Sequence, residues 1–106
     1  MTTPTRTTTD YFASGTWEVV DGSAEEFVRR WTEFLAWTRD EHPAFRSARL
    51  IRDLRRPNHF VSFAAWTDPA ALAAWREEPG FAERFGRCRE LCASMSGSGY
   101  ALVAAI

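Results

Sequence analysis

The residues most able to do chemistry are few in this chain. Its two histidines are His42 and His59, and its two cysteines, Cys88 and Cys92, lie four positions apart in a segment with a helical pattern. Neither histidine has a cysteine or a carboxylate at a metal-ligand spacing within the same predicted element, so we expect no metal site. The cysteine spacing is unsuited to a disulfide and is typical of reduced, core-facing thiols.

Sequence motifs of the common catalytic machineries are also missing. The chain contains no glycine-rich phosphate loop, no G-x-S-x-G nucleophile elbow and no H-E-x-x-H pair. Two of the carboxylates, Glu26 and Asp68, stand at positions that favour helix capping. We therefore expect neither a metal centre nor a conventional nucleophile.

Aromatic residues are unusually frequent, with five Trp, eight Phe and two Tyr in 106 residues. Indoles seldom bury completely and their N–H groups need partners, so a core alone would be filled more simply by Leu and Ile. The simpler interpretation is still that all of these rings are core. The functional interpretation is a largely apolar pocket with a few polar groups, which suits a flat aromatic ligand. The side chains that can converge there are Trp31, Phe34, Thr38, Ser62, Trp66, Trp75, Phe81 and Phe85.

The elements that would position these side chains begin with a strand and a helix. Residues 12–20 have strand composition and stop at the turn pair Asp21-Gly22. Ser23 stands three positions before Glu26, the capping-box spacing, and an amphipathic helix is predicted over residues 24–40. Its predicted buried face carries Val28, Trp31, Phe34, Leu35, Thr38 and His42.

The rest of the chain predicts two more strands, a broken helix and a last strand. We expect strands at 45–54 and 59–66, helices at 69–76 and 81–92, a linker of small residues at 96–99, and a strand at 100–106. The resulting order, βαββαβ with a broken second helix, predicts an α+β fold of ferredoxin-like type with an antiparallel sheet.

The sheet of such a fold has its helices on one face only. The third and fourth predicted strands are apolar on both faces, and an exposed apolar face of that size is rare in monomers. Packing against an identical sheet would bury it in a closed dimer. We therefore predict a homodimer.

Length and charge exclude several classes of protein. A chain of 106 residues fits one domain, predicted at 12–106 after a Thr-rich arm at 1–11 that is disordered or extended. The net charge is −1 and all thirteen cations are Arg, so no strong field would attract nucleic acid or a membrane surface. We find no secretory signal or spanning segment, and we expect a cytoplasmic protein.

Four segments together resemble the antibiotic biosynthesis monooxygenase family: DGSAEEF at 21–27, PNHFVSF at 57–63, WTD at 66–68, and AWR at 74–76 with Pro79 and Phe81. The likeness covers about residues 12–106. It implies a dimeric α/β-barrel. In the best understood members it implies oxidation of aromatic polyketide phenols or anthrones by molecular oxygen, with no metal or flavin.

The resemblance also implies site residues. The cavity tryptophan of the anthrone oxygenases corresponds to Trp66, which would hold the substrate oxygen through its indole N–H. Their asparagine four positions earlier is Ser62 here and their tyrosine six positions later is Leu72, which leaves His59, or else His42, as the candidate base. Haem-degrading relatives carry an axial histidine where this chain has Phe85, so we expect no haem and no other cofactor.

The sequence thus predicts an enzyme, a cofactor-independent monooxygenase or oxidase of an aromatic polyketide-type substrate. In this hypothesis Trp66, Ser62 and His59 are catalytic, while Trp31, Phe34, Thr38, Trp75, Phe81 and Phe85 bind the substrate. Two alternatives remain open from the residues alone. One is a non-oxidative polyketide cyclase or isomerase on the same fold, and the other is an accessory protein that binds a small molecule without catalysis.

Overall fold

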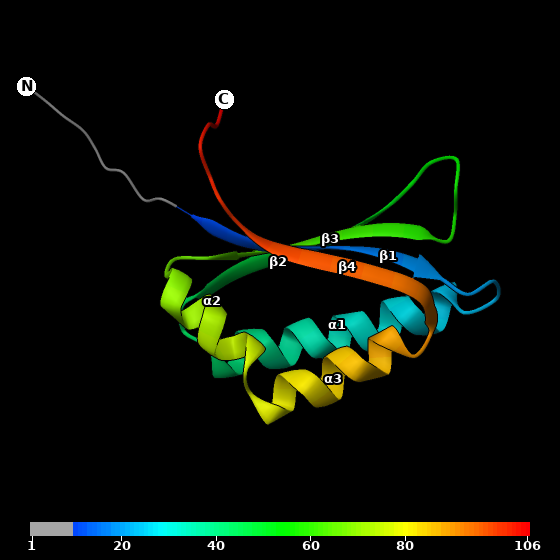
Figure 1. Ribbon diagram of the computed structural model, residues 1–106, viewed down its shortest axis with the longest axis horizontal. Coiled ribbons are helices and arrows are strands. Elements are labelled where there is room, and N and C mark those ends of the chain that lie inside the picture. The colour runs from blue at the N-terminus through cyan, green and yellow to red at the C-terminus, as the bar shows by residue number, and fades with distance from the viewer. Residues whose placement is uncertain (1–9) are drawn as a thin grey trace, which may run out of the picture.

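Alternating inward and outward side chains build one antiparallel sheet in the computed structural model, which describes residues 10–106. The sheet has four strands in the spatial order β2-β3-β1-β4 (Figure 1). Their bounds are β1 Tyr11–Val19, β2 Phe45–Arg52, β3 His59–Trp66 and β4 Cys92–Ala101. β1 pairs with β3 and with β4, and β2 completes the other edge by pairing with β3.

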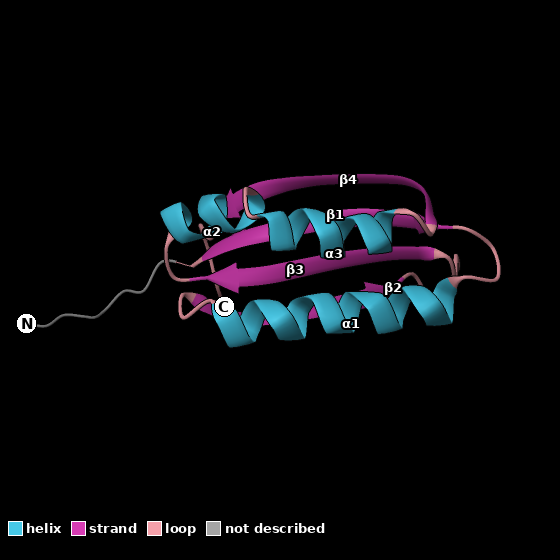
Figure 2. Cartoon of the chain, turned by 90° about the horizontal axis from the view of Figure 1, so that it is seen from below, coloured by secondary structure: helices cyan, strands magenta, loops and turns pink. Residues whose placement is uncertain are grey.

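Three helices cover one face of this sheet (Figures 1 and 2). Their bounds are α1 Ala24–Glu41, α2 Pro69–Arg76 and α3 Pro79–Arg89. The element order β-α-β-β-α-α-β confirms the predicted α+β fold of ferredoxin-like type. α1 and α3 lie side by side beneath the strands, and α2 lies at one end of the sheet.

The turn before α1 and the cap of α2 agree with the sequence prediction, whereas the cap of α1 does not. Gly22 has a φ of 87°, a conformation open to glycine, and it turns the chain from β1 into α1. Asp68 caps α2 by accepting a hydrogen bond from the backbone N–H of Ala70, as predicted. The predicted capping box of Ser23 is wrong, because its side chain makes no cap bond and Glu26 bonds arginines of α1 instead.

The buried stripe of α1 is rotated from the predicted one. Phe27 is fully buried, whereas Val28 is 37% exposed and was wrongly placed in the core. Trp31, Phe34 and Thr38 continue the stripe from Phe27 at helical spacing. The rotation lets the larger phenyl ring, rather than the isopropyl group, fill the space against the sheet.

The end of the chain departs most from the prediction. α3 stops at Arg89 and Cys92 begins β4, so the helix predicted over 81–92 is three residues too long. The small residues 96–99, predicted as a linker, lie inside β4, where Gly97 pairs with Gly15 of β1. The small residues of β4 have a low propensity for strands, and they form one because their backbone groups pair with those of β1. Residues 102–106, predicted as strand, lie beyond β4 and are exposed.

The two faces of β3 differ in what covers them. Phe60, Ser62, Ala64 and Trp66 are buried beneath the helices, whereas His59, Val61 and Phe63 point to the opposite face. No helix of the described residues covers that outer face (Figure 1). The arm predicted at 1–11 lies outside the described residues up to residue 9, and β1 already begins at Tyr11.

Candidate functional site

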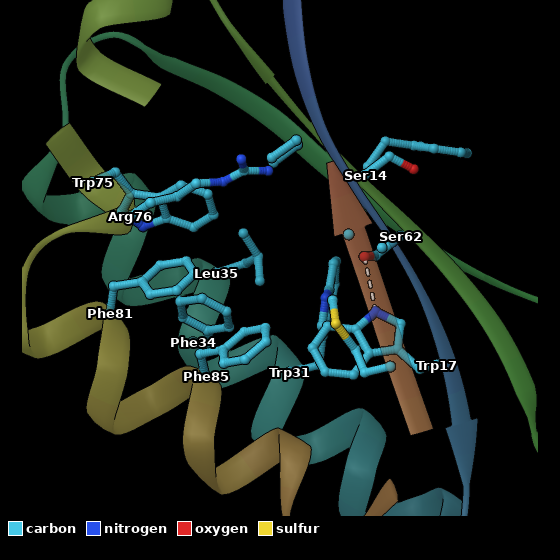
Figure 3. Close-up of a pocket in the computed structure, with 16 residues that line it drawn as sticks. Ser14, Trp17, Trp31, Phe34, Leu35, Ser62, Trp75, Arg76, Phe81 and Phe85 are labelled. Carbon is cyan, nitrogen blue, oxygen red and sulfur yellow. Dashed lines mark hydrogen bonds between the residues drawn. The ribbon is translucent and has the colours of Figure 1, made fainter. Parts of the chain in front are cut away.

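A partly open cavity of about 370 Å³ lies between the helices and the inner face of the sheet (Figure 3). This volume falls within the range of about 300–1,000 Å³ that is usual for small-molecule sites. Its lining comes from β1, β3 and β4 on one side and from all three helices on the other. Six of the residues proposed from the sequence line it: Trp31, Phe34, Ser62, Trp75, Phe81 and Phe85.

Aromatic rings in fixed orientations form the helix side of the cavity (Figure 3). Phe34 stacks on Trp75 with ring centroids 5.7 Å apart, and Phe81 meets Trp75 edge-on at 4.7 Å. Phe81 in turn stacks on Phe85 at 5.2 Å. Such pairs stabilise one another by about 0.5–1.5 kcal/mol beyond simple burial. The wall therefore consists of two stacked pairs of rings, Phe34 with Trp75 and Phe81 with Phe85, that stand nearly perpendicular to each other.

The polar centre of the cavity is a hydrogen-bonded pair that joins two strands. The indole Nε1 of Trp17 donates to Ser62 Oγ at 3.0 Å (Figure 3). Trp17 is 2% exposed and Ser62 is 8% exposed. Since the Ser62 oxygen already accepts this bond, its own O–H proton is free to donate to a ligand in the cavity.

Thr38 lies behind the cavity wall rather than on it. Its Oγ1 accepts a hydrogen bond from Trp75 Nε1 at 3.0 Å and donates to the Phe34 carbonyl at 2.9 Å. The Thr38 side chain is fully buried and does not line the cavity. The structure therefore makes it a support for the Trp75 ring.

Trp66 also lies one layer behind the cavity. It is fully buried, and its ring packs on Trp75 at 5.0 Å and edge-on to Phe45 at 5.7 Å. Its Nε1 has no hydrogen-bond partner within residues 10–106. The Trp75 ring lines the cavity and Trp66 does not.

The two histidines lie outside the cavity lining. His59 points to the outer face, where its Nδ1 bonds the Glu18 carboxylate, which also accepts from Arg56 at 2.8 Å. The hydrogen bond from His59, followed by the charge of Arg56, lowers the pKa of Glu18. His42 is held by the Thr38 carbonyl and by the Glu78 carboxylate at 2.8 Å.

The cysteines are free and buried, as the sequence predicted. Burial raises the pKa of the Cys88 thiol to about 12, and burial also raises the pKa of Cys92. Both thiols are therefore protonated at neutral pH, and neither lines the cavity. Among residues 10–106 there is no group of three or more His, Cys, Asp or Glu side chains suited to a metal ion.

Sequence reasoning missed several residues of the site. Trp17 faces the helices from β1, which its alternation with Val19 and the buried Gly15 could have indicated. Met95 and Gly97 line the cavity from β4, and the sequence predicted only a linker at 96–99. Arg76 is the one charged residue in the described cavity lining, and nothing in its spacing marks it out.

The sequence model described as "Antibiotic biosynthesis monooxygenase" matches residues 11–86. The chain belongs to the antibiotic biosynthesis monooxygenase family. The matched part runs from β1 into α3 and so includes both Trp17 and Ser62. β4, with Met95 and Gly97, lies outside the match. No curated protein sequence matches the chain significantly.

Solved structures resemble this antibiotic biosynthesis monooxygenase family member along almost its whole length. SnoaB of Streptomyces nogalater, described as a cofactor-independent oxygenase, is 22% identical with a TM-score of 0.80, over 94% of this chain and 98% of its own. A conserved protein from Methanosarcina mazei is 15% identical with a TM-score of 0.77, over 88% and 92%. At these identities the likeness establishes the fold. Within residues 10–106, no helix has the length and apolar character needed to span a membrane.

Proposed function

We propose that this family member is a cofactor-independent monooxygenase or oxidase that acts on an aromatic polyketide-type substrate. The family and the monooxygenase-type fold support the reaction class. The observation that carries the proposal is the Trp17–Ser62 pair, which orients a hydroxyl donor in a cavity lined mainly by apolar and aromatic side chains. A planar ligand with one ring oxygen would stack on the aromatic wall and accept from Ser62.

The chemistry follows from this donor. When a phenol or anthrone loses a proton, negative charge gathers on its oxygen, and a donor fixed in the cavity wall stabilises that anion. The electron-rich carbanion form of the ring then reduces oxygen directly. For an anthrone, one oxygen atom becomes the new carbonyl, and the other leaves as water with the two hydrogens of the methylene carbon.

The proton acceptor is not a side chain of the cavity lining. Among residues 10–106 the lining contains neither a carboxylate nor an imidazole, and His59 stands on the opposite face of the sheet. We therefore assign the proton to solvent water that enters through the open side of the cavity. Trp66 and Thr38, which contact Trp75, act by positioning that ring.

Product analysis with and without oxygen tests the proposal. Purified protein is mixed with an anthrone in air and under strict anaerobiosis, and anthraquinone is measured. The oxygenase predicts product in air alone. A rearranged product formed without oxygen would instead indicate a cyclase or isomerase, and tight binding without product in either condition would indicate a binding protein.

The outer face of the sheet supports a homodimer. Val61 and Phe63 are only partly covered there, and Tyr100 is 58% exposed. The exposed residues 102–106 leave the sheet on the same side (Figure 1). We propose that a second copy covers this face and that light scattering will give twice the chain mass. Val61→Lys should yield monomers, whereas Leu54→Lys in the exposed hairpin should not.

The free thiols of Cys88 and Cys92 support a reducing compartment. We therefore propose that the reaction takes place in the cytoplasm.

A further inference from the structure

Arg76 places a positive charge on an aromatic cavity. It is the last residue of α2 and the one charged residue in the described lining (Figure 3). Its side chain extends from beside Trp75 toward the strands. Its Nη1 lies 3.8 Å from the position that a Cβ would take on Gly99 of β4, so the guanidinium reaches across one end of the cavity.

This charge has no counterion in the described part of the chain. Arg29, Arg30 and Arg56 each contact a carboxylate within 4.0 Å. Arg76 is exposed to solvent and, like Arg49 and Arg52, contacts no carboxylate among residues 10–106, but it differs from those two in lining the cavity. Gly97 and Gly99 have no side chains to fill the space on the β4 side. The guanidinium is therefore free to pair with a group on a ligand.

We propose that Arg76 selects planar aromatic ligands that carry a carboxylate, an inference that rests on the proposed function of the cavity. The ring oxygen of such a ligand binds the Ser62 hydroxyl, and its carboxylate binds the Arg76 guanidinium. A guanidinium and a carboxylate match in a planar, two-bond geometry, which is stronger and more specific than a single point charge.

The surroundings favour a carboxylate over a phosphate. A phosphate usually requires several cations or the N-terminus of a helix, and Arg76 stands alone at the C-terminus of α2. One arginine with two parallel N–H groups provides what a monovalent, planar anion needs. The positive charge of Arg76 also interacts favourably with the C-terminal end of the α2 dipole. A lysine would keep this charge but could not form two parallel hydrogen bonds to a carboxylate.

Binding of two matched probes tests the inference. An anthraquinone carboxylate and its neutral hydroxymethyl analogue are titrated into the full-length protein, with tryptophan fluorescence as the readout. Wild type, Arg76→Gln, Arg76→Lys and the surface control Arg55→Gln are compared. Arg55 is exposed in the hairpin, so Arg55→Gln makes the same charge change away from the cavity.

We expect wild type and Arg55→Gln to bind the carboxylate about tenfold more tightly than the neutral probe. Arg76→Gln should lose the preference and bind both probes about equally, and Arg76→Lys should keep part of the preference. Equal binding of both probes by wild type would overturn the inference and leave the oxygenase untouched. Anthrone turnover is measured separately, so its absence with the preference intact would overturn the oxygenase alone. Binding of neither probe would overturn both.

Discussion

Trp17 and Ser62 meet at 3.0 Å across two neighbouring strands, with the indole N–H donating to the hydroxyl oxygen. Ser62 lies opposite Gly15 in the β1–β3 register, and Gly15 stands two positions before Trp17 on β1. The Trp17 indole therefore reaches Ser62 diagonally across Gly15, which has no side chain. This relationship converts a common core serine into an oriented donor. Both members are nearly inaccessible to water, so the bond is not weakened by competition with solvent.

Removal of the hydroxyl should impair turnover more than folding. Ser62→Ala should lower kcat for an anthrone about 100-fold, since loss of one donor to a developing oxyanion costs about that factor. Steady-state oxygen uptake measures the effect. Ser23→Ala is the matched control, because the Ser23 side chain makes no cap bond and should leave kcat unchanged.

Trp17→Phe removes the indole N–H and keeps an aromatic ring on β1. The Ser62 hydroxyl then loses its orientation but remains present, so kcat should fall about tenfold, less than in Ser62→Ala. The double variant should be no slower than Ser62→Ala alone if Trp17 acts through the hydroxyl. Additive losses in that double variant would contradict the coupling.

Gly15 keeps the space that the pair needs. A Cβ there would lie 2.8 Å from Met95 Cε, 3.1 Å from Trp17 Nε1 and 3.3 Å from Ser62 Oγ. Gly15→Ala should therefore displace the pair and weaken ligand affinity at least tenfold in fluorescence titrations. Gly86→Ala in α3 is the control, since nothing lies within 4 Å of its Cβ. It should leave affinity unchanged and, as alanine in a helix, raise stability.

Thr38 provides the acceptor for the buried Trp75 N–H. Thr38→Val keeps the shape of the side chain and leaves that N–H unpaired, which should lower the free energy of unfolding by about 1–3 kcal/mol. Thr38→Ser keeps the oxygen and should recover most of this loss. Urea unfolding of the two variants makes the comparison. Equal stability of Thr38→Val and wild type would show that the bond contributes nothing.

Acid should weaken the ion pairs that Glu26 makes with Arg29 and Arg30 on α1. Arg30 of α1 bonds Glu26, the Arg87 carbonyl within α3, and Glu90, which directly follows α3. Hydrogen bonds from Arg29, then from Arg30, lower the pKa of Glu26 from 4.5 to about 2. Because the folded-state pKa is depressed, this stabilisation is present above pH 4.5 and is lost as pH falls toward 2.

Glu26→Gln should flatten that acid dependence. The free energy of unfolding, measured with urea between neutral pH and about pH 3, should fall less steeply in Glu26→Gln than in wild type. Glu25→Gln on the same helix is the control and should follow wild type. If the free energy of unfolding falls equally steeply with pH in Glu26→Gln and wild type, Glu26 does not contribute to the loss of stability in acid.

The sequence predicted β3 at its observed bounds, because period and residue type determine a strand. It also singled out five aromatic side chains that line the cavity, namely Trp31, Phe34, Trp75, Phe81 and Phe85. It failed where partners far along the chain decide the outcome. β4 forms from small residues because their backbone groups hydrogen-bond with β1. Such pairing between distant segments produces no recognisable pattern in the local sequence. The bond between Trp17 and Ser62 was missed for the same reason, since the two residues lie 45 positions apart in the chain.

Depth within the core is also hidden from sequence. Trp66 and Trp75 both belong to predicted inward faces, and only packing reveals that Trp75 lines the cavity while Trp66 lies behind it. His59 shows the limit of strand alternation. Its position in β3 predicts the face that it shares with Val61, but not that Glu18 binds its ring.

A crystal structure with anthraquinone bound tests the central claim most directly. The account predicts the planar ligand between the aromatic wall and the sheet, with one carbonyl oxygen within hydrogen-bond distance of Ser62 Oγ. A cavity left empty at saturating ligand, or a ligand seated elsewhere with Ser62 uncontacted, would contradict it.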